Sequence, residues 1–132
     1  MQGSENLEII RRLFAFYHKG DMKAMMSFFT SDAIWIEPGD YSIPYAGVFE
    51  GITEIQRMLG IIAQHLRMIS FQADSFCANE NIVTAIGSNE AEVIATGKIY
   101  KTDWVYVFTL VNAHITNVQV YMDTQAISVA FR

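Results

Sequence analysis

The stretch from residue 34 to residue 51 holds the side chains best placed to do chemistry. Glu37 ends a strand-like segment, residues 33–37, and the alternation of a strand puts it on the same face as the indole of Trp35. A Pro-Gly pair ends the segment, since proline lacks an amide hydrogen and glycine permits a sharp turn. A loop carrying Tyr45 follows. A carboxylate at a strand end, beside an indole and under a phenol, indicates the rim of a small-molecule pocket.

Length and composition limit the class of protein. The 132 residues, of which 52% are hydrophobic and 13% aromatic, fit one compact domain over residues 1–132 and exclude a disordered chain. We expect no membrane partner, because no apolar run approaches the ~20 residues of a membrane span. We expect no nucleic-acid partner, because the net charge is −5 and the basic residues are scattered.

The expected location is the cytoplasm. The first 25 residues do not have the pattern of a signal peptide, and the single Cys77 cannot form an internal disulfide. Cys77 lies among apolar strand residues, so we expect a buried thiol. The histidines lack the spacing of metal ligands, so we expect no metal site and no cofactor.

Periodicity predicts an α+β fold. Three amphipathic helices are predicted before the main run of strands. They span about residues 5–18, residues 21–29, and the segment from the cap Thr53 to about residues 65–67. Strand-like runs follow at 68–78, 82–88, 93–111 and 115–122, separated by short turns that favour an antiparallel meander. The third run is too long for one flat strand, and Gly97 is the expected bulge.

The strands of the second half are partly apolar on both faces. Trp104 and Tyr106 share one face of the third run, and Val105 and Val107 lie on the other. A sheet of this kind needs both faces covered. The helices can cover one face, and we expect a second copy of the chain to cover the other, in a homodimer formed through the sheet.

Three segments carry a family resemblance: Ser-Asp-Ala-Ile-Trp-Ile-Glu-Pro-Gly (31–39), Pro-Tyr-Ala-Gly-Val-Phe-Glu-Gly (44–51) and Tyr-Met-Asp-Thr-Gln-Ala (121–126). With the order of helices and strands, they resemble the SnoaL-like branch of the nuclear transport factor 2-like superfamily, which includes ketosteroid isomerase, limonene epoxide hydrolase and polyketide cyclases. The resemblance implies a cystatin-like cone, in which a curved antiparallel sheet wraps around three N-terminal helices and leaves a central apolar pocket.

The resemblance also implies two catalytic residues. Glu37 matches the general-base carboxylate of ketosteroid isomerase, and Asp123 matches a catalytic aspartate on the last strand of the cyclases and epoxide hydrolases. A carboxylate in an apolar pocket loses hydration, so its pKa rises and it becomes a better proton acceptor. The isomerase's oxyanion tyrosine aligns with Leu13, whereas Tyr17 lies one turn further along, a shift of ~6 Å.

The pocket wall and the core form one surface in such a cone, so aromatic and apolar residues become ligand-binding candidates. They are Trp35, Tyr17, Tyr45, Met58, His65, Trp104, Tyr106 and Tyr121. The resulting hypothesis is a protein that binds a small hydrophobic or aromatic molecule and acts as a cofactor-independent isomerase, cyclase or dehydratase. The alternative is a non-catalytic module of the same fold, used for ligand binding or for dimeric interaction.

Overall fold

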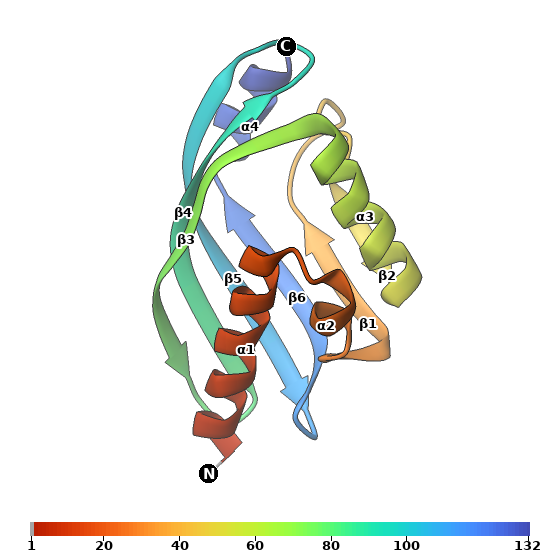
Figure 1. Cartoon of the computed structure of the whole chain (residues 1–132), viewed down its shortest axis with the longest axis vertical. Helices are drawn as coiled ribbons and strands as arrows, with labels where there is room; N and C mark the ends of the chain where they lie inside the picture. Colours follow the sequence, from red (N-terminus) through yellow and green to blue (C-terminus); the bar gives the residue numbers. More distant parts are fainter. Residues whose placement is uncertain (1) are drawn as a thin grey trace.

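The computed structural model describes residues 2–132 and confirms the predicted α+β cone. Six strands form one strongly curved sheet in the order β2-β1-β6-β5-β4-β3 (Figure 1). Neighbouring strands are antiparallel, except that β1 and β6 run parallel. The strands are β1 (Phe29–Glu37), β2 (Gly47–Glu50), β3 (Leu66–Ala78), β4 (Ile82–Val93), β5 (Ile99–Val111) and β6 (His114–Met122).

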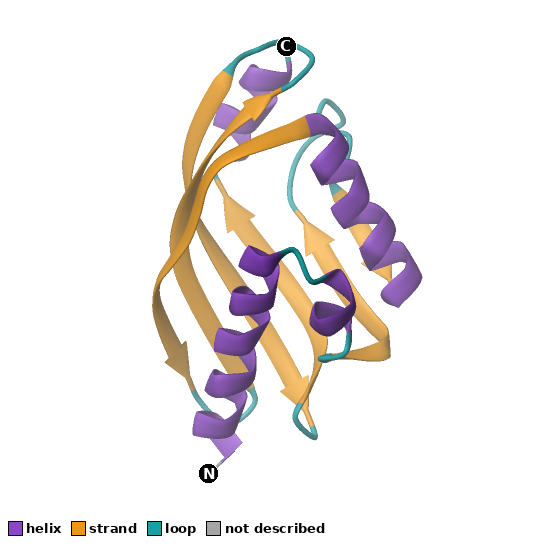
Figure 2. Cartoon of the chain, in the orientation of Figure 1, coloured by secondary structure: helices purple, strands orange, loops and turns teal. Residues whose placement is uncertain are grey.

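Four helices accompany the sheet: α1 (Gln2–Lys19), α2 (Met22–Met26), α3 (Ile52–His65) and α4 (Thr124–Phe131). The first three cover the concave face, and α4 lies at the end of the sheet near the β4–β5 turn (Figure 2). The predicted cap Thr53 is wrong. Gly51, whose φ of 91° suits glycine, stands at the cap position and α3 begins directly after it. Within the described residues, no helix is both long and apolar enough to cross a membrane.

The sequence pattern missed two elements, β2 and α4, and misplaced several boundaries; β1 begins at Phe29, inside the predicted helix 21–29 and before the predicted strand 33–37. The predicted bulge at Gly97 is wrong, because β4 continues to Val93 and β5 begins only at Ile99. Gly97 lies in the turn between them, with a φ of 73° and its amide bonded to the Val93 carbonyl at 2.8 Å. A glycine with positive φ fits this tight turn between paired strands.

Strand pairing puts the Trp35 face of β1 and the Tyr106 face of β5 on the inside, whereas β6 turns inward its Val118 face and not the predicted Tyr121 face. Trp35 of β1 pairs with Val118 of β6, and Val118 pairs in turn with Phe108 of β5. Tyr106 pairs with Val120 in the adjacent row. These side chains, which alternate with outward-facing residues along each strand, form the inner layer of the core under the helices.

Cys77 lies on the opposite, outer face. The prediction of a buried thiol is wrong, because Cys77 is exposed and pairs with Thr84 of β4. The pairing of β3 with β4 shifts between Ala73 and Ser75, and such an irregularity changes which side chains point inward. As a result Phe76 packs on the core and Cys77 faces outward.

Candidate active site

A cavity lies between the concave face of the sheet and the first three helices. It encloses about 700 Å³, its open mouth included. Leu13, Phe14 and Tyr17 line it from α1, and Leu59 and Ile62 line it from α3. The strands contribute Trp35, Phe71, Tyr106, Phe108 and Met122, among others, so most of the wall is apolar or aromatic. Such a wall suits a small apolar ligand.

Glu37 is the carboxylate of this cavity. It is the last residue of β1, and only 5% of its surface is exposed. The indole N–H of Trp35 donates a 2.9 Å hydrogen bond to its Oε1. Burial raises the pKa of Glu37 from 4.5 to about 7, against the smaller, lowering effect of the Trp35 hydrogen bond. The carboxyl group is therefore able to accept and release a proton near neutral pH.

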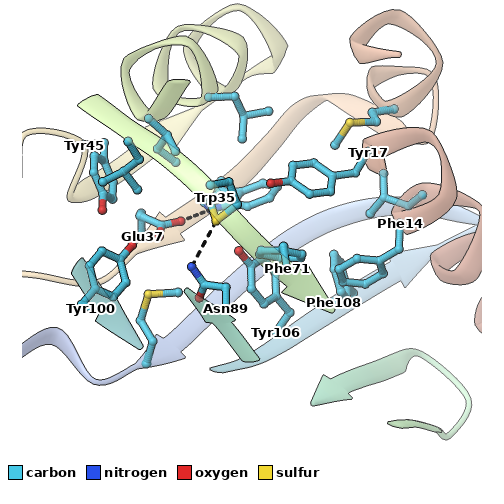
Figure 3. Close-up of a pocket in the computed structure, with 17 residues that line it drawn as sticks. Phe14, Tyr17, Trp35, Glu37, Tyr45, Phe71, Asn89, Tyr100, Tyr106 and Phe108 are labelled. Atoms are coloured by element: carbon cyan, nitrogen blue, oxygen red, sulfur yellow. Dashed lines mark hydrogen bonds between the residues drawn. The ribbon is translucent and has the colours of Figure 1, made fainter. Parts of the chain in front are cut away.

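Tyrosine hydroxyls surround this carboxyl group (Figure 3). The hydroxyls of Tyr45 and Tyr100 are hydrogen-bonded to each other, and burial raises the pKa of both. The shared bond raises the pKa of Tyr45 and lowers that of Tyr100. Burial holds the pKa of Tyr106 well above its usual range, with a further contribution from the charge of Glu37. All three phenols thus remain protonated and can act as donors.

Asn89 brings an amide group to the same end of the cavity. It lies on the inner face of β4, is 5% exposed, and its Nδ2 is 3.3 Å from Sδ of Met68. The amide also hydrogen-bonds the Tyr100 hydroxyl and lowers the pKa of that phenol. Tyr45 and Asn89 thus both lie against the Tyr100 hydroxyl.

The loop that carries Tyr45 is tied to the C-terminal helix. Asp40 accepts hydrogen bonds from the Ser42 amide at 2.9 Å and from the Ser128 hydroxyl of α4 at 3.0 Å. The ring of Phe131, also on α4, meets the ring of Tyr45 edge-on at 5.9 Å. These contacts hold the Tyr45 hydroxyl against Tyr100, so α4 helps to fix the donor arrangement of the cavity.

Comparison with known protein families agrees with this geometry. The family model of the SnoaL-like domain matches residues 10–118. The chain belongs to the SnoaL-like family. No curated protein matches it significantly.

Solved structures similar to this SnoaL-like chain cover it along nearly its whole length. A nuclear transport factor 2-like protein from Burkholderia xenovorans is 27% identical, with a TM-score of 0.90 over 100% of this chain and 99% of its own. TerC, co-crystallised with polyporic acid, is 21% identical, with a TM-score of 0.86 over 96% of this chain and 98% of its own. A candidate polyketide cyclase from Xanthomonas campestris is 15% identical, with a TM-score of 0.81 over the full length of both chains. The last two likenesses concern the fold.

Five of the residues singled out in the sequence line the cavity of this SnoaL-like chain. Glu37, Trp35, Tyr17, Tyr45 and Tyr106 all face it. Tyr17 is half-buried, and burial raises the pKa of its phenol. The structure thus brings the predicted carboxylate together with four of the eight predicted ligand-binding side chains.

Asp123 lies elsewhere. It is exposed, and its Oδ1 accepts a 3.0 Å hydrogen bond from the Ala126 amide as the N-cap of α4. It does not line the apolar cavity; it borders an open polar hollow together with Lys101 and Asp103. The expected orientation of Asp123 into the pocket is therefore wrong, because strand β6 ends at Met122 and the chain turns into a helix that needs a cap.

The remaining predicted side chains also lie outside the cavity wall. Met58 is fully buried in the core, and the ring of Trp104 is stacked against the rings of Phe14 and Phe71. His65 ends α3 with its ring against Phe131, at 6.2 Å between centroids. Tyr121 is 55% exposed on the outer face of β6.

Sequence reasoning missed Tyr100 and Asn89. The alternation that placed Trp104 and Tyr106 on one face of β5 also places Tyr100 there, four residues before Trp104. The predicted runs 82–88 and 93–111 leave Asn89 in the turn between them, whereas it lies within β4. The signal for Asn89 was the alternation of small apolar residues on either side of it, from Val83 to Val93.

Proposed function

We propose that this cavity binds a small apolar ketone and that Glu37 removes a proton from the carbon beside the carbonyl group. The observation that carries this proposal is a buried carboxyl group with a pKa of about 7, next to protonated phenols in an otherwise apolar cavity. A base of this pKa is half ionised at neutral pH and still basic enough to assist carbon deprotonation. A candidate isomerase and polyketide cyclases among the structural neighbours fit this class of chemistry.

The phenols supply the second requirement of the reaction. When Glu37 takes the proton, the electron pair of the C–H bond forms a C=C bond, and the carbonyl π pair moves onto oxygen as an enolate. Tyr100 is the donor we assign to that oxygen, because its hydroxyl stays protonated and lines the cavity at the same end as Glu37 and Asn89. Return of the proton from Glu37 to another carbon of the conjugated system completes an isomerisation and restores the carboxylate.

Exchange of ketone hydrogens in heavy water tests this step without knowledge of the natural substrate. We expect the protein to accelerate deuterium incorporation into 2-tetralone, followed by proton NMR. Glu37→Gln should lose ~10²-fold or more of the rate, and Tyr100→Phe ~10- to 10³-fold, because each removes a group that acts in the transition state.

Asp123→Asn is the matched carboxylate change, and the position of Asp123 outside the cavity predicts an unchanged rate. Loss of exchange in Asp123→Asn, with full activity in Glu37→Gln, would contradict the assignment of Glu37. Binding of 2-tetralone with no exchange in the unaltered protein would instead support a non-catalytic ligand-binding module.

We also propose that the outer face of the sheet packs against a second copy of the chain. One row of outward-facing side chains crosses all six strands without a charge, and it consists of Val48, Ile36, Gln119, Val107, Thr84 and Cys77. In the next row, Ile86 is 46% and Tyr121 55% exposed on either side of Val105. An uncharged, partly apolar face of this extent supports a homodimer interface.

A further inference from the structure

The carbonyl oxygen of Asn89 is a buried acceptor that the protein leaves unused. Asn89 is the one polar residue on the inner face of β4, where its neighbours are valine, alanine and glycine. No described group donates a hydrogen bond to its Oδ1. Burying an amide oxygen without a donor costs free energy, so such an atom in a folded protein needs an explanation.

The position of this oxygen suggests that a bound molecule supplies the missing donor. Among the described residues, two other buried side-chain atoms lack a hydrogen-bond partner, on Asn6 and Trp104, and neither residue lines the cavity. Asn89 does line it, at the end where Glu37, Tyr45 and Tyr100 gather (Figure 3). The unpaired acceptor has almost no exposed surface of its own, but it belongs to a side chain of the cavity wall, where a bound molecule can supply the missing donor.

The distance to Tyr100 limits where the ligand's donor can be. The side-chain amide of Asn89 lies against the Tyr100 hydroxyl and lowers the pKa of that phenol, so Oδ1 stands about one amide group away from the Tyr100 oxygen. The proposed function places the ligand's carbonyl oxygen on the O–H of Tyr100. A hydroxyl that reaches Oδ1 must then lie on the carbon next to the carbonyl, or one carbon further away.

We propose that Oδ1 of Asn89 accepts a hydrogen bond from a ligand hydroxyl, and that the ligand is a ring-bearing hydroxy ketone with its two oxygens on adjacent or next-adjacent carbons. The aromatic wall contributed by Phe14, Phe71 and Phe108 encloses the ring. Placement of the carbonyl on Tyr100 rests on the proposed function. The hydroxyl contact with Asn89 is a separate property of the same site.

Three acetophenones test the hydroxyl contact by binding alone. Acetophenone carries no hydroxyl, 2-hydroxy-1-phenylethanone carries one beside the carbonyl, and 4′-hydroxyacetophenone carries one across the ring. We expect 2-hydroxy-1-phenylethanone to bind the unaltered protein about tenfold more tightly than acetophenone, and 4′-hydroxyacetophenone to show no such gain. Protein-observed NMR titration gives the three dissociation constants.

Asn89→Leu removes the amide at nearly constant volume, and we expect it to abolish the tenfold preference while acetophenone still binds. Asn117→Leu makes the same change on the outer face of β6 and should keep the preference. Equal binding of all three ketones to the unaltered protein would overturn the proposal, and this comparison holds even if Asn89→Leu does not fold. A preference retained in Asn89→Leu would overturn it as well.

The binding and exchange experiments separate the two proposals. A tenfold preference that depends on Asn89, without exchange of 2-tetralone hydrogens, would sustain the hydroxyl contact and contradict proton transfer by Glu37. Exchange that depends on Glu37, without any preference among the acetophenones, would do the reverse. Failure of all three acetophenones to bind would contradict the hydroxyl contact and would leave the exchange of 2-tetralone hydrogens as the test of Glu37.

Discussion

The indole N–H of Trp35 donates a 2.9 Å hydrogen bond to Oε1 of Glu37, two residues further along strand β1. The two side chains share the inner face because a strand points alternate residues the same way. Burial raises the pKa of Glu37, and this hydrogen bond opposes the rise by stabilising the charged carboxylate. The balance between them sets the pH at which Glu37 can act as a base.

Trp35→Phe should therefore move the pH dependence of proton exchange to higher pH. The change removes the donor but keeps an aromatic ring, so burial acts on Glu37 with less opposition and its pKa rises above about 7. A hydrogen bond to a charged group contributes ~1.5–3 kcal/mol, which corresponds to a shift of ~1–2 pH units. The rate of 2-tetralone exchange, measured from pH 5 to 10, gives the midpoint.

Trp104→Phe is the matched control. The indole of Trp104 is buried, has no hydrogen-bond partner for its Nε1, and is stacked on Phe14 and Phe71. We expect this variant to lose stability through poorer packing but to keep the midpoint of the exchange profile. An unchanged midpoint in Trp35→Phe, or an equal shift in both variants, would show that the Trp35 hydrogen bond does not set the pKa of Glu37.

Glu37 should also make the folded protein less stable as the pH rises. Its pKa is 4.5 in the unfolded reference and about 7 in the fold, so between these values the native state binds the extra proton. Its stabilising contribution is complete below pH 4.5 and is lost as the pH rises through 7, about 3 kcal/mol in all. Urea unfolding at pH 5 and pH 8 measures this difference.

Glu37→Gln cannot ionise, so this part of the pH dependence should vanish in that variant. Asp123→Asn removes an exposed carboxylate instead and should leave the fall between pH 5 and pH 8 in place. If the unaltered protein and Glu37→Gln lost the same free energy of unfolding over this range, Glu37 would not be buried in the way the fold implies.

Substitution by alanine should have opposite effects on stability at Gly87 and at Gly60. A Cβ on Gly87 would meet the Gln72 carbonyl oxygen of β3 and approach Cζ2 of Trp104 to 2.5 Å, so Gly87→Ala must push strands apart. We expect it to lose ~1–3 kcal/mol or more. Gly60 lies within α3 with no atom within 4 Å of such a Cβ, so Gly60→Ala should gain up to ~1 kcal/mol. Thermal unfolding of both variants checks the two signs.

The alternation of side chains along the strands predicted from the sequence which residues of β1 and β5 share a face. The alternation of side chains along β1 puts Trp35 and Glu37 on one face of that strand. The same alternation along β5 puts Trp104 and Tyr106 on one face of that strand. Trp35, Glu37 and Trp104 are buried, and Tyr106 is partly buried. Whether Trp104 or Tyr106 lines the cavity depends on the residues packed above them. The sequence does not show that Phe14 and Phe71 stack against Trp104.

At Asp123, the alternation of side chains along β6 and the match to a catalytic residue of the family lead to different predictions. It has the parity of Tyr121, which faces outward, and not that of Met122, which faces the cavity. Thr-Gln-Ala after the aspartate is compatible with the start of a helix, and an aspartate before a helix is a preferred N-cap. These two local signals favoured a capping role, whereas the resemblance alone favoured the pocket.

The uncharged row on the outer face leads to a prediction about assembly. Val107 lies near the middle of that row, paired with Thr84 and Gln119. In a monomer, an outward lysine at this position would reach water at little cost. In a dimer formed through the sheet, it would be buried opposite its own symmetry copy without a partner, which strongly disfavours association.

Val107→Lys should therefore convert a dimer into a monomer, observed as a halved mass by light scattering during gel filtration. Ile94→Lys is the control, because Ile94 is 56% exposed in the β4–β5 turn and lies off the sheet face. This variant should keep the dimer mass. A monomeric mass for the unaltered protein, or a dimer that survives Val107→Lys, would exclude the outer face as the interface.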